Sequence, residues 1–274
     1  MHTKRQLPQV TLCCVDTRTP DLAITAIMHC VRQFEFGHIV FIGPEGWSGA
    51  ASLPSFIQFV AIPGLDGISA YSSFMLTKLT QYIPTSHALV TQWDGYITRP
   101  DLWKPEFLDY DYIGAPWYHR PSEVSVGNGG FSLRSKRLMD SVKALEIPND
   151  QPEDSAICIH LRKELCENHG IRFAPLQLAQ QFSCEYGPWR AAFGFHGMHN
   201  FAYVMSETEL SSWLITAPAE ILRSQHTRNL IKTLMRCGRT AEAKTLIRQR
   251  GQLTGWNLDQ WTLNLRATVH QLMD

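Results

Sequence analysis

The chain has 274 residues, of which 25 are basic and 25 acidic, so its formal net charge is zero. This length accommodates one substantial α/β domain and a small additional unit. Because surfaces that bind nucleic acid are usually basic, the balanced charge argues against nucleic acid as the main partner. No run of about 18 uncharged apolar residues occurs, which predicts that there is no membrane span. Lys4 and Arg5 are not followed by the apolar stretch of a signal peptide.

The seven cysteines are an odd number, and their spacings contain no paired C-x-x-C clusters. Most of them lie inside apolar segments. This pattern favours buried thiols in a reducing cytoplasm over disulfides or a zinc site.

Short apolar runs alternate with helical patterns through the first part of the chain. Strands are predicted at 10–15, 38–42, 56–62 and 88–91, and helices from Pro20 onward and over 69–83. This alternation is typical of right-handed βαβ units and a mainly parallel sheet. Ligands bind beyond the carboxyl ends of such strands, so Asp16 and Asp94, which follow two of them, are expected in one crevice.

The pattern changes after Asp94. We expect short strands at 110–116, 127–133 and 171–174, and helices at 136–145 and 152–169. From about residue 207 the sequence becomes helical, and a hairpin around the turn Cys237–Arg239 resembles one tetratricopeptide unit. We therefore predict a catalytic domain at 1–205 and a helical extension at 206–274. The extension is expected to pack on the catalytic domain, with self-association or recruitment of a partner as the alternative.

Two short motifs have residues that suit a sugar-phosphate ligand. Asp94 follows a strand and precedes Gly95, so it either caps a turn or holds a divalent cation against a diphosphate. The Asn128-Gly129-Gly130 segment is either a tight turn or a place where the backbone comes close to a bound sugar.

Two further motifs also allow a structural and a chemical interpretation. Glu153 and Asp154 follow Pro152 at a predicted helix start, where acids cap the helix or could serve as a general base. His196 stands between two glycines in an aromatic loop, which is less typical of core packing than of a metal ligand or a phosphate partner.

The order of these motifs resembles that of GT-A glycosyltransferases. It is more closely similar to a bacterial domain of unknown function assigned to that superfamily. The matching stretches are 88–96, 109–117 (DYDYIGAPW), 127–134 (GNGGFSLR), 152–155 and 193–199. The resemblance covers most of the predicted catalytic domain. It implies an α/β, GT-A-like and Rossmann-like fold, with a mixed sheet flanked by helices and a C-terminal helical tail.

The resemblance also implies roles for single residues. Asp94 would be the surviving carboxylate of an Asp-x-Asp motif that holds Mn²⁺ or Mg²⁺ on the donor diphosphate. His196 would match the late histidine that completes metal or diphosphate binding. Asp154, with Glu153 beside it, would occupy the base position of inverting members.

The donor is expected to meet three other segments. The backbone of Asn128, Gly129 and Gly130 would line the donor-sugar and acceptor side. Residues expected at the nucleotide are Asp16, Thr17 and Arg18, and further candidates for the base and the diphosphate are Tyr71 and Lys78. One departure is Gln92, which stands where an Asp-x-Asp motif has its first acid. An amide oxygen can ligate a metal but contributes no charge, so weaker metal affinity is expected.

The resemblance thus implies a cytoplasmic glycosyltransferase, with a peripheral position at the inner face of the membrane as a second location. It would move a sugar from a nucleoside diphosphate sugar, a uridine rather than a guanosine derivative, to a glycan or other hydroxyl acceptor. Two alternatives stay open. One is hydrolysis of nucleotide sugars or phosphoryl transfer on the same scaffold. The other is a non-catalytic binding module, which Gln92 in place of an acid would suit.

Overall fold

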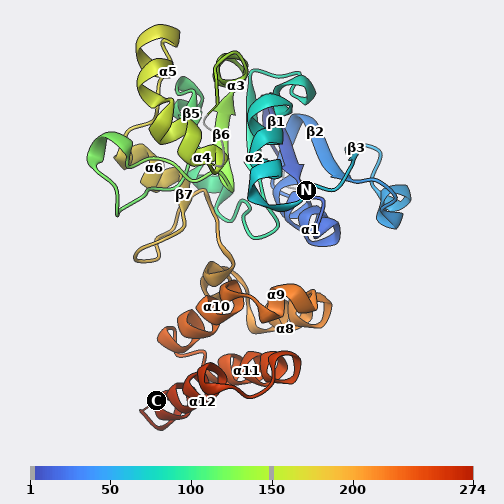
Figure 1. The fold of residues 1–274 in the computed structure, drawn as a ribbon, viewed down its shortest axis with the longest axis vertical. Coiled ribbons are helices and arrows are strands. Elements are labelled where there is room, and N and C mark those ends of the chain that lie inside the picture. Colours follow the sequence, from blue (N-terminus) through green and yellow to red (C-terminus); the bar gives the residue numbers. More distant parts are fainter. Residues whose placement is uncertain (1–3, 148–150, 274) are drawn as a thin grey trace. The chain divides into compact units, whose positions relative to one another are not determined.

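The computed structural model describes residues 4–147 and 151–273. By its internal contacts the chain divides into two compact units, Met1–His196 and Gly197–Asp274 (Figure 1). None of the helices in the described part of the chain is both long and apolar enough to cross a membrane.

The first unit is built on a six-stranded sheet with the order β3-β2-β1-β4-β6-β5. The strands are β1 (Arg5–Val15), β2 (Phe34–Pro44), β3 (Gln58–Ile62), β4 (His87–Thr91), β5 (Tyr112–Ile113) and β6 (Phe131–Ser135). The first four in this order run parallel, whereas β6 is antiparallel to both β4 and β5. The predicted α/β class, with a mixed sheet flanked by helices and a helical C-terminal part, is confirmed.

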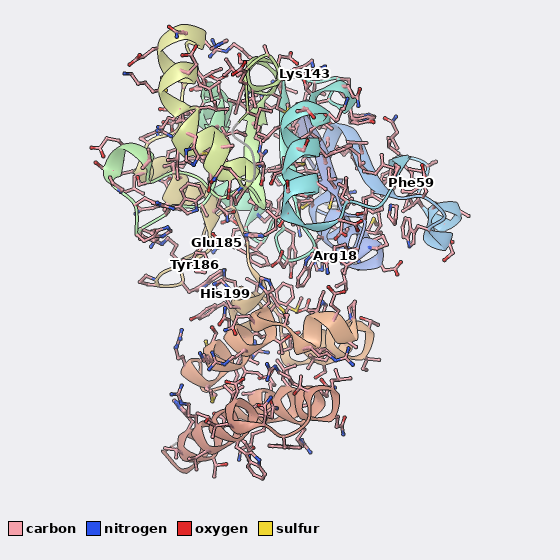
Figure 2. The ribbon with its side chains drawn as sticks, viewed as in Figure 1. Arg18, Phe59, Lys143, Glu185, Tyr186 and His199 are labelled. Carbon is pink, nitrogen blue, oxygen red and sulfur yellow. The ribbon has the colours of Figure 1, made fainter. Side chains whose placement is uncertain are left out.

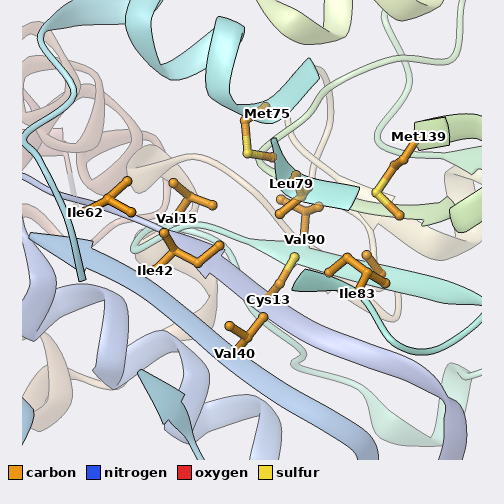
Figure 3. Close-up of a cluster of buried hydrophobic side chains, with 11 residues drawn as sticks. Cys13, Val15, Val40, Ile42, Ile62, Met75, Leu79, Ile83, Val90 and Met139 are labelled. Carbon is orange, nitrogen blue, oxygen red and sulfur yellow. The ribbon is translucent and has the colours of Figure 1, made fainter. Parts of the chain in front are cut away.

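Both faces of the central strands are covered, which explains why the sequence of β1 reads as a continuous apolar run. On one face, Cys13 and Val15 pack with side chains of β2 and β4 against Met75 and Leu79 (Figure 3). Cys14 points to the other face. There α1 (Pro20–Val31) packs on β1 and β2. Burial of each large apolar side chain contributes about 1.5–3 kcal/mol to this core.

Two helices of the first unit begin at Pro20 and Lys136, as the sequence indicates, whereas the helix at Leu176–Phe182 was not expected. Besides α1, the helices of this unit are α2 (Gly67–Thr77), α3 (Lys136–Lys143), α4 (Glu153–Ser155), α5 (Arg162–His169) and α6 (Leu176–Phe182). The expected helix 69–83 ends at Thr77 and continues as a 3-10 turn over Leu79–Tyr82. Other 3-10 turns are Ser48–Ser52, Pro100–Leu102, Pro105–Asp109 and Ser122–Val124.

Two expectations for the middle of the chain are wrong. The helix expected over 152–169 is interrupted by a π turn at Ala156–His160, so that α4 and α5 are separate. The strand expected at 171–174 is reduced to one bridge between Phe173 and Tyr112. A second, two-stranded parallel sheet is formed by β7 (Ser183–Cys184) and β8 (Gly194–Phe195). It was not predicted, because strands of two residues are too short to show a periodic pattern.

The second unit is helical, as expected from residue 207 onward. Its helices are α7 (Phe201–Val204), α8 (Glu207–Thr216), α9 (Ala219–Arg223), α10 (Gln225–Arg236), α11 (Thr240–Thr254) and α12 (Leu258–Met273), after a 3-10 turn at Met198–Asn200. A capping box between Ser206 and Glu209 starts α8. Gly238, with φ of 72°, supplies the turn that joins α10 and α11 into a hairpin, and α12 packs on both.

Candidate active site

The turn after β4 presents Asp94 at the border between the parallel and antiparallel parts of the sheet. The hydroxyl of Thr91 donates to the carbonyl of Gly95, and the Gly95 N–H donates to the Gln92 carbonyl at 3.1 Å. A Cβ at Gly95 would come within 2.8 Å of the Phe195 carbonyl oxygen, so the glycine lets this turn approach β8. Asp94 is only 4% exposed. The position of β8 therefore decides what the Asp94 carboxylate meets.

His196, the residue after β8, lies against Asp94. Its Nε2 is 3.3 Å from Asp94 Oδ1 and 3.1 Å from Gln92 Oε1. Its Nδ1 is 3.0 Å from Glu185 Oε1. Burial by itself would lower the pKa of His196, but the carboxylates of Asp94 and Glu185 raise this pKa well above its usual value. The structure thus brings together Asp94 and His196, which the sequence placed in one site.

Glu185 is a part of this centre that the sequence analysis missed. It follows β7 and is buried, and its Oε2 accepts a 2.6 Å hydrogen bond from Asn128 Nδ2. Figure 2 labels it beside Tyr186 on the segment between β7 and β8. No motif in the sequence singles out this acid. Its role becomes visible only once β7 and β8 pair and bring it to His196.

The glycines of the Asn128-Gly129-Gly130 loop make room for the protein's own side chains. A Cβ on Gly130 would overlap the imidazole of His196, and one on Gly129 would overlap the Glu153 carboxylate. Asn128 itself has a left-handed φ of 61°. Its Oδ1 is buried and has no hydrogen-bond partner among the described residues. The loop is therefore shaped by close packing and also leaves an unsatisfied acceptor beside the His196 ring.

Glu153 belongs to a separate buried ion pair. Its Oε1 lies 3.0 Å from Nη2 of Arg134, which is only 1% exposed. The same guanidinium donates to the Gly129 carbonyl at 3.2 Å and, through Nε, to Ser132 Oγ at 3.0 Å. Arg134 thus holds the glycine loop through the Gly129 carbonyl, and the Glu153 carboxylate is engaged by Arg134. Arg134 lies within the glycine motif, but the motif alone did not assign it a role.

Asp154 faces the glycine loop, in contrast to its neighbour Glu153. Its Oδ2 accepts from the Gly129 N–H at 3.1 Å, and its Oδ1 accepts from the Ser155 N–H at 2.7 Å. Its side chain is partly accessible, whereas Glu153 is buried. Of the two adjacent acids, Asp154 is therefore the one able to meet a ligand.

Tyr71 and Lys78, both predicted on the helix before Asp94, have different surroundings. The Tyr71 hydroxyl accepts a 2.9 Å hydrogen bond from Gln92 Nε2 and so supports the centre through that amide. Burial raises the pKa of Tyr71 well above its usual value, so the phenol stays protonated at neutral pH. Lys78 is exposed at the end of α2, and the described residues show no hydrogen bond between it and the centre.

The three residues expected at the nucleotide form the loop after β1. The Asp16 carboxylate accepts from the N–H groups of Arg18 and Thr19 at 2.8 and 2.7 Å, and the Thr17 hydroxyl accepts from the Leu65 N–H at 2.9 Å. Because β1 and β4 are parallel neighbours, this loop and the Asp94 turn lie at the same edge of the sheet. Arg18 is exposed there.

A family model described as "Protein of unknown function (DUF5672)" matches residues 56–196, more than half of the chain. The chain belongs to this family. The expectation of a family of unknown function is thereby confirmed. The DUF5672 match ends at His196 and includes Asp94, the glycine loop and both adjacent acids, so the whole centre lies within it. The search of curated proteins found no match.

Several solved structures are similar to this DUF5672 protein. Mannosyltransferase PcManGT from Pyrobaculum calidifontis, in complex with GDP-Man and Mn²⁺, is 12% identical, with 98% of this chain and 89% of that chain covered and a TM-score of 0.42. An active-site mutant of LgtC is 12% identical, with 77% and 98% covered and a TM-score of 0.44. Galactosyltransferase LgtC with donor and acceptor sugar analogs is 11% identical, with 93% and 99% covered and a TM-score of 0.41. Similarity at this level does not transfer an activity.

The residues of the DUF5672 centre are chemically suited to a hard divalent cation. Cis ligands of an octahedral ion bound at about 2.1 Å lie about 3 Å apart. The separations of His196 Nε2 from Asp94 Oδ1 and from Gln92 Oε1, 3.3 and 3.1 Å, are close to this value. The buried Oδ1 of Asn128 is one more oxygen donor in the same loop. Within the described residues, no three His, Cys, Asp or Glu side chains form a metal cluster by themselves.

Proposed function

We propose that this protein is a glycosyltransferase that uses a nucleoside diphosphate sugar as donor and a hydroxyl group as acceptor. The observation that supports this most strongly is the contact between Asp94 and His196. They meet at the carboxyl end of β4, beside the glycine loop that contacts Asp154. The contact joins motifs that lie far apart in sequence and occur in the order typical of GT-A enzymes. A carboxylate, an imidazole and a candidate base around one loop support the proposal.

A divalent cation, Mn²⁺ or Mg²⁺, is proposed as the cofactor. Asp94 and His196 would hold it, with the His196 imidazole giving up one proton to bind the ion and the amide oxygen of Gln92 as a neutral third donor. When bound, such an ion offsets the negative charge that develops on the leaving diphosphate. Because Gln92 contributes no charge, we expect binding that is weaker than at a site with two carboxylates and that depends on the donor diphosphate for further ligands.

Asp154 is proposed as the general base. Its carboxylate would accept the proton of the acceptor hydroxyl while the hydroxyl oxygen forms a bond to the anomeric carbon and the bond from that carbon to the diphosphate oxygen breaks. The result is inversion at this carbon. The hydrogen bond from the Gly129 N–H orients the carboxylate. Glu153 is not assigned this role, because it is buried and paired with Arg134.

The donor is proposed to be a uridine diphosphate sugar whose nucleotide meets Asp16, Thr17 and Arg18 at the neighbouring strand end. The acceptor is proposed to be a glycan or another hydroxyl compound, and the site of action to be the cytoplasm. The sheet supports this place for the nucleotide. Because β1 and β4 are parallel, the loop after β1 and the Asp94 turn lie at the same end of their strands.

The Asp154→Asn variant tests the assignment of the base. A panel of nucleotide sugars with a mixture of sugar acceptors would first identify a transfer reaction in the full-length protein. In the variant, transfer should fall by about 10²–10⁴-fold, because the amide cannot accept the proton. Donor binding should change less than about twofold in calorimetry. Glu106→Gln, at an exposed acid, is the matched control and should leave both quantities unchanged.

Three outcomes would contradict the proposal. A variant that keeps most of its transfer rate would exclude Asp154 as the base. Release of free sugar at the same rate with and without acceptors would indicate a hydrolase. Failure of the wild-type protein to bind any nucleotide, with or without Mn²⁺, would favour a non-catalytic binding module.

A further inference from the structure

The last helix, α12, has a row of apolar side chains on its outer face. Leu258, Trp261, Leu265 and Val269 are spaced by three or four residues, which places them on one side of the helix. They are 84%, 58%, 66% and 47% exposed. Trp256, also exposed, lies with its ring 4.9 Å from that of Trp261. We call these five residues the apolar row.

The opposite side of α12 already provides its attachment to the second unit. Gln260, Leu263 and Ala267 are buried there, and the Gln260 amide donates to the carbonyl of Ile247 in α11. The apolar row is therefore not needed for the packing of α12. Large apolar side chains gathered in one exposed row are typical of a surface that binds a partner or a membrane.

A group of cations lies along the side of α12 that faces α10. Arg228, Lys232 and Arg236 follow one another at four-residue spacing on α10, and Arg266 is on α12. Arg228 is paired with Asp259 at 2.7 Å. The other three have no acidic partner among the described residues. Partial burial and the three neighbouring arginines lower the pKa of Lys232, as expected where cations crowd together.

The two features adjoin each other. Arg266 directly follows Leu265 of the apolar row, and Asp259, which directly follows Leu258, reaches across to Arg228 of α10. On a helix, neighbours in sequence lie about 100° apart. Arg266 therefore lies beside the apolar row on the side of α12 where Asp259 contacts α10, and Lys232 interacts with both Arg266 and Asp259 there.

We propose that the apolar row and the cations of α10 and α12 bind the surface of an anionic lipid bilayer. Exposed leucine and tryptophan side chains would enter the boundary between headgroups and acyl chains, where tryptophan is favoured. The cations would attract the lipid phosphates. A second copy of the chain is a poorer fit, because it would bring the same cations to the interface and repel. This inference is independent of the proposed sugar transfer.

Flotation of the full-length protein with vesicles tests the proposal. One set is pure phosphatidylcholine and the other contains about 30% phosphatidylglycerol, a charged lipid. The wild-type protein should bind the charged vesicles at about 0.05 M salt and be released at about 0.5 M. Lys232→Gln/Arg236→Gln should lower the partition coefficient by about 10- to 30-fold. Each cation near a charged membrane raises this coefficient about fivefold, and the variant removes two.

Two further variants separate the two features. Leu258→Asn/Leu265→Asn alters the two most exposed members of the apolar row and should abolish vesicle binding while circular dichroism and the unfolding midpoint stay unchanged. Arg223→Gln/Arg248→Gln removes the same amount of charge from exposed positions on α9 and α11 and should bind as the wild type does.

The proposal fails if the wild-type protein does not float with charged vesicles. Equal binding to neutral and charged vesicles, or an equal loss in the α9/α11 control, would also overturn it. So would a concentration-dependent dimer in ultracentrifugation that Leu258→Asn/Leu265→Asn dissociates, because the row would then bind a second copy. None of these readouts depends on an enzymatic assay, so failure here leaves the proposed transferase activity untouched.

Discussion

Two buried polar groups share the glycine loop of the first unit, but they differ in kind. In one, Arg134 and Glu153 satisfy each other and the guanidinium also holds a backbone carbonyl. In the other, His196 lies between acids and amides, and the Oδ1 of Asn128 has no partner among the described residues. A satisfied pair stabilises a fold, whereas a centre with an unsatisfied acceptor is suited to a ligand. One loop can therefore hold a satisfied structural ion pair on one side and a centre suited to a ligand on the other.

The largest effect is expected when the satisfied pair is broken. Glu153→Gln leaves the charge of Arg134 buried without its carboxylate, which should lower the free energy of unfolding by about 3–5 kcal/mol. Urea denaturation followed by tryptophan fluorescence measures this. The double variant Arg134→Met/Glu153→Met should lose less than Glu153→Gln, because it leaves no unpaired charge. If Glu153→Gln is as stable as the wild type, the pair does not hold the loop.

A smaller loss of stability is expected at Gly130, where the glycine loop contacts His196. Gly130→Ala places a methyl group where the His196 imidazole lies, so the ring must move or the loop must shift. We expect a loss of about 1–3 kcal/mol in the free energy of unfolding, together with a loss of metal-dependent nucleotide binding. Gly64→Ala is the control, since its added Cβ meets no atom within 4 Å among the described residues other than its chain neighbours. Unchanged stability and binding in Gly130→Ala would refute the close approach.

The smallest loss of stability is expected at Asp111, a carboxylate that belongs neither to the Arg134–Glu153 pair nor to the His196 centre. Asp111 accepts from Ser135 Oγ at 2.6 Å and from Arg137 Nε at 3.2 Å. Burial would raise the pKa of Asp111, but Arg137, Ser135 and the Arg172 N–H together lower it below its usual value. Its stabilising contribution is therefore complete above the unfolded value of about 3.9 and is lost as the pH falls through the lower folded value.

Denaturation of wild type and Asp111→Asn over a pH series measures this contribution. The variant should be less stable by about 1–2 kcal/mol at neutral pH. The difference should shrink below about pH 4, as the native carboxylate becomes protonated. A difference that grows as the pH falls would contradict the sign of the shift.

The sequence predicts the parallel half of the sheet well, because strands buried on both faces leave continuous apolar runs such as Val10–Val15. It also places Asp94 and His196 in one site, through the order of motifs. It does not predict the contact between His196 and Glu185, which depends on the pairing of two-residue strands. Nor does it separate Glu153 from Asp154. Neighbours on a helix point about 100° apart, and only the packing of α4 shows that Glu153 meets Arg134 and Asp154 meets Gly129.

The most direct test of the central claim is calorimetric titration of uridine diphosphate into the full-length protein with and without Mn²⁺. If Asp94 and His196 hold a cation against the diphosphate, binding should be at least about tenfold tighter with Mn²⁺, and Asp94→Asn should remove that gain while Glu106→Gln keeps it. Equal affinity with and without the metal, or an undiminished gain in Asp94→Asn, would contradict the account.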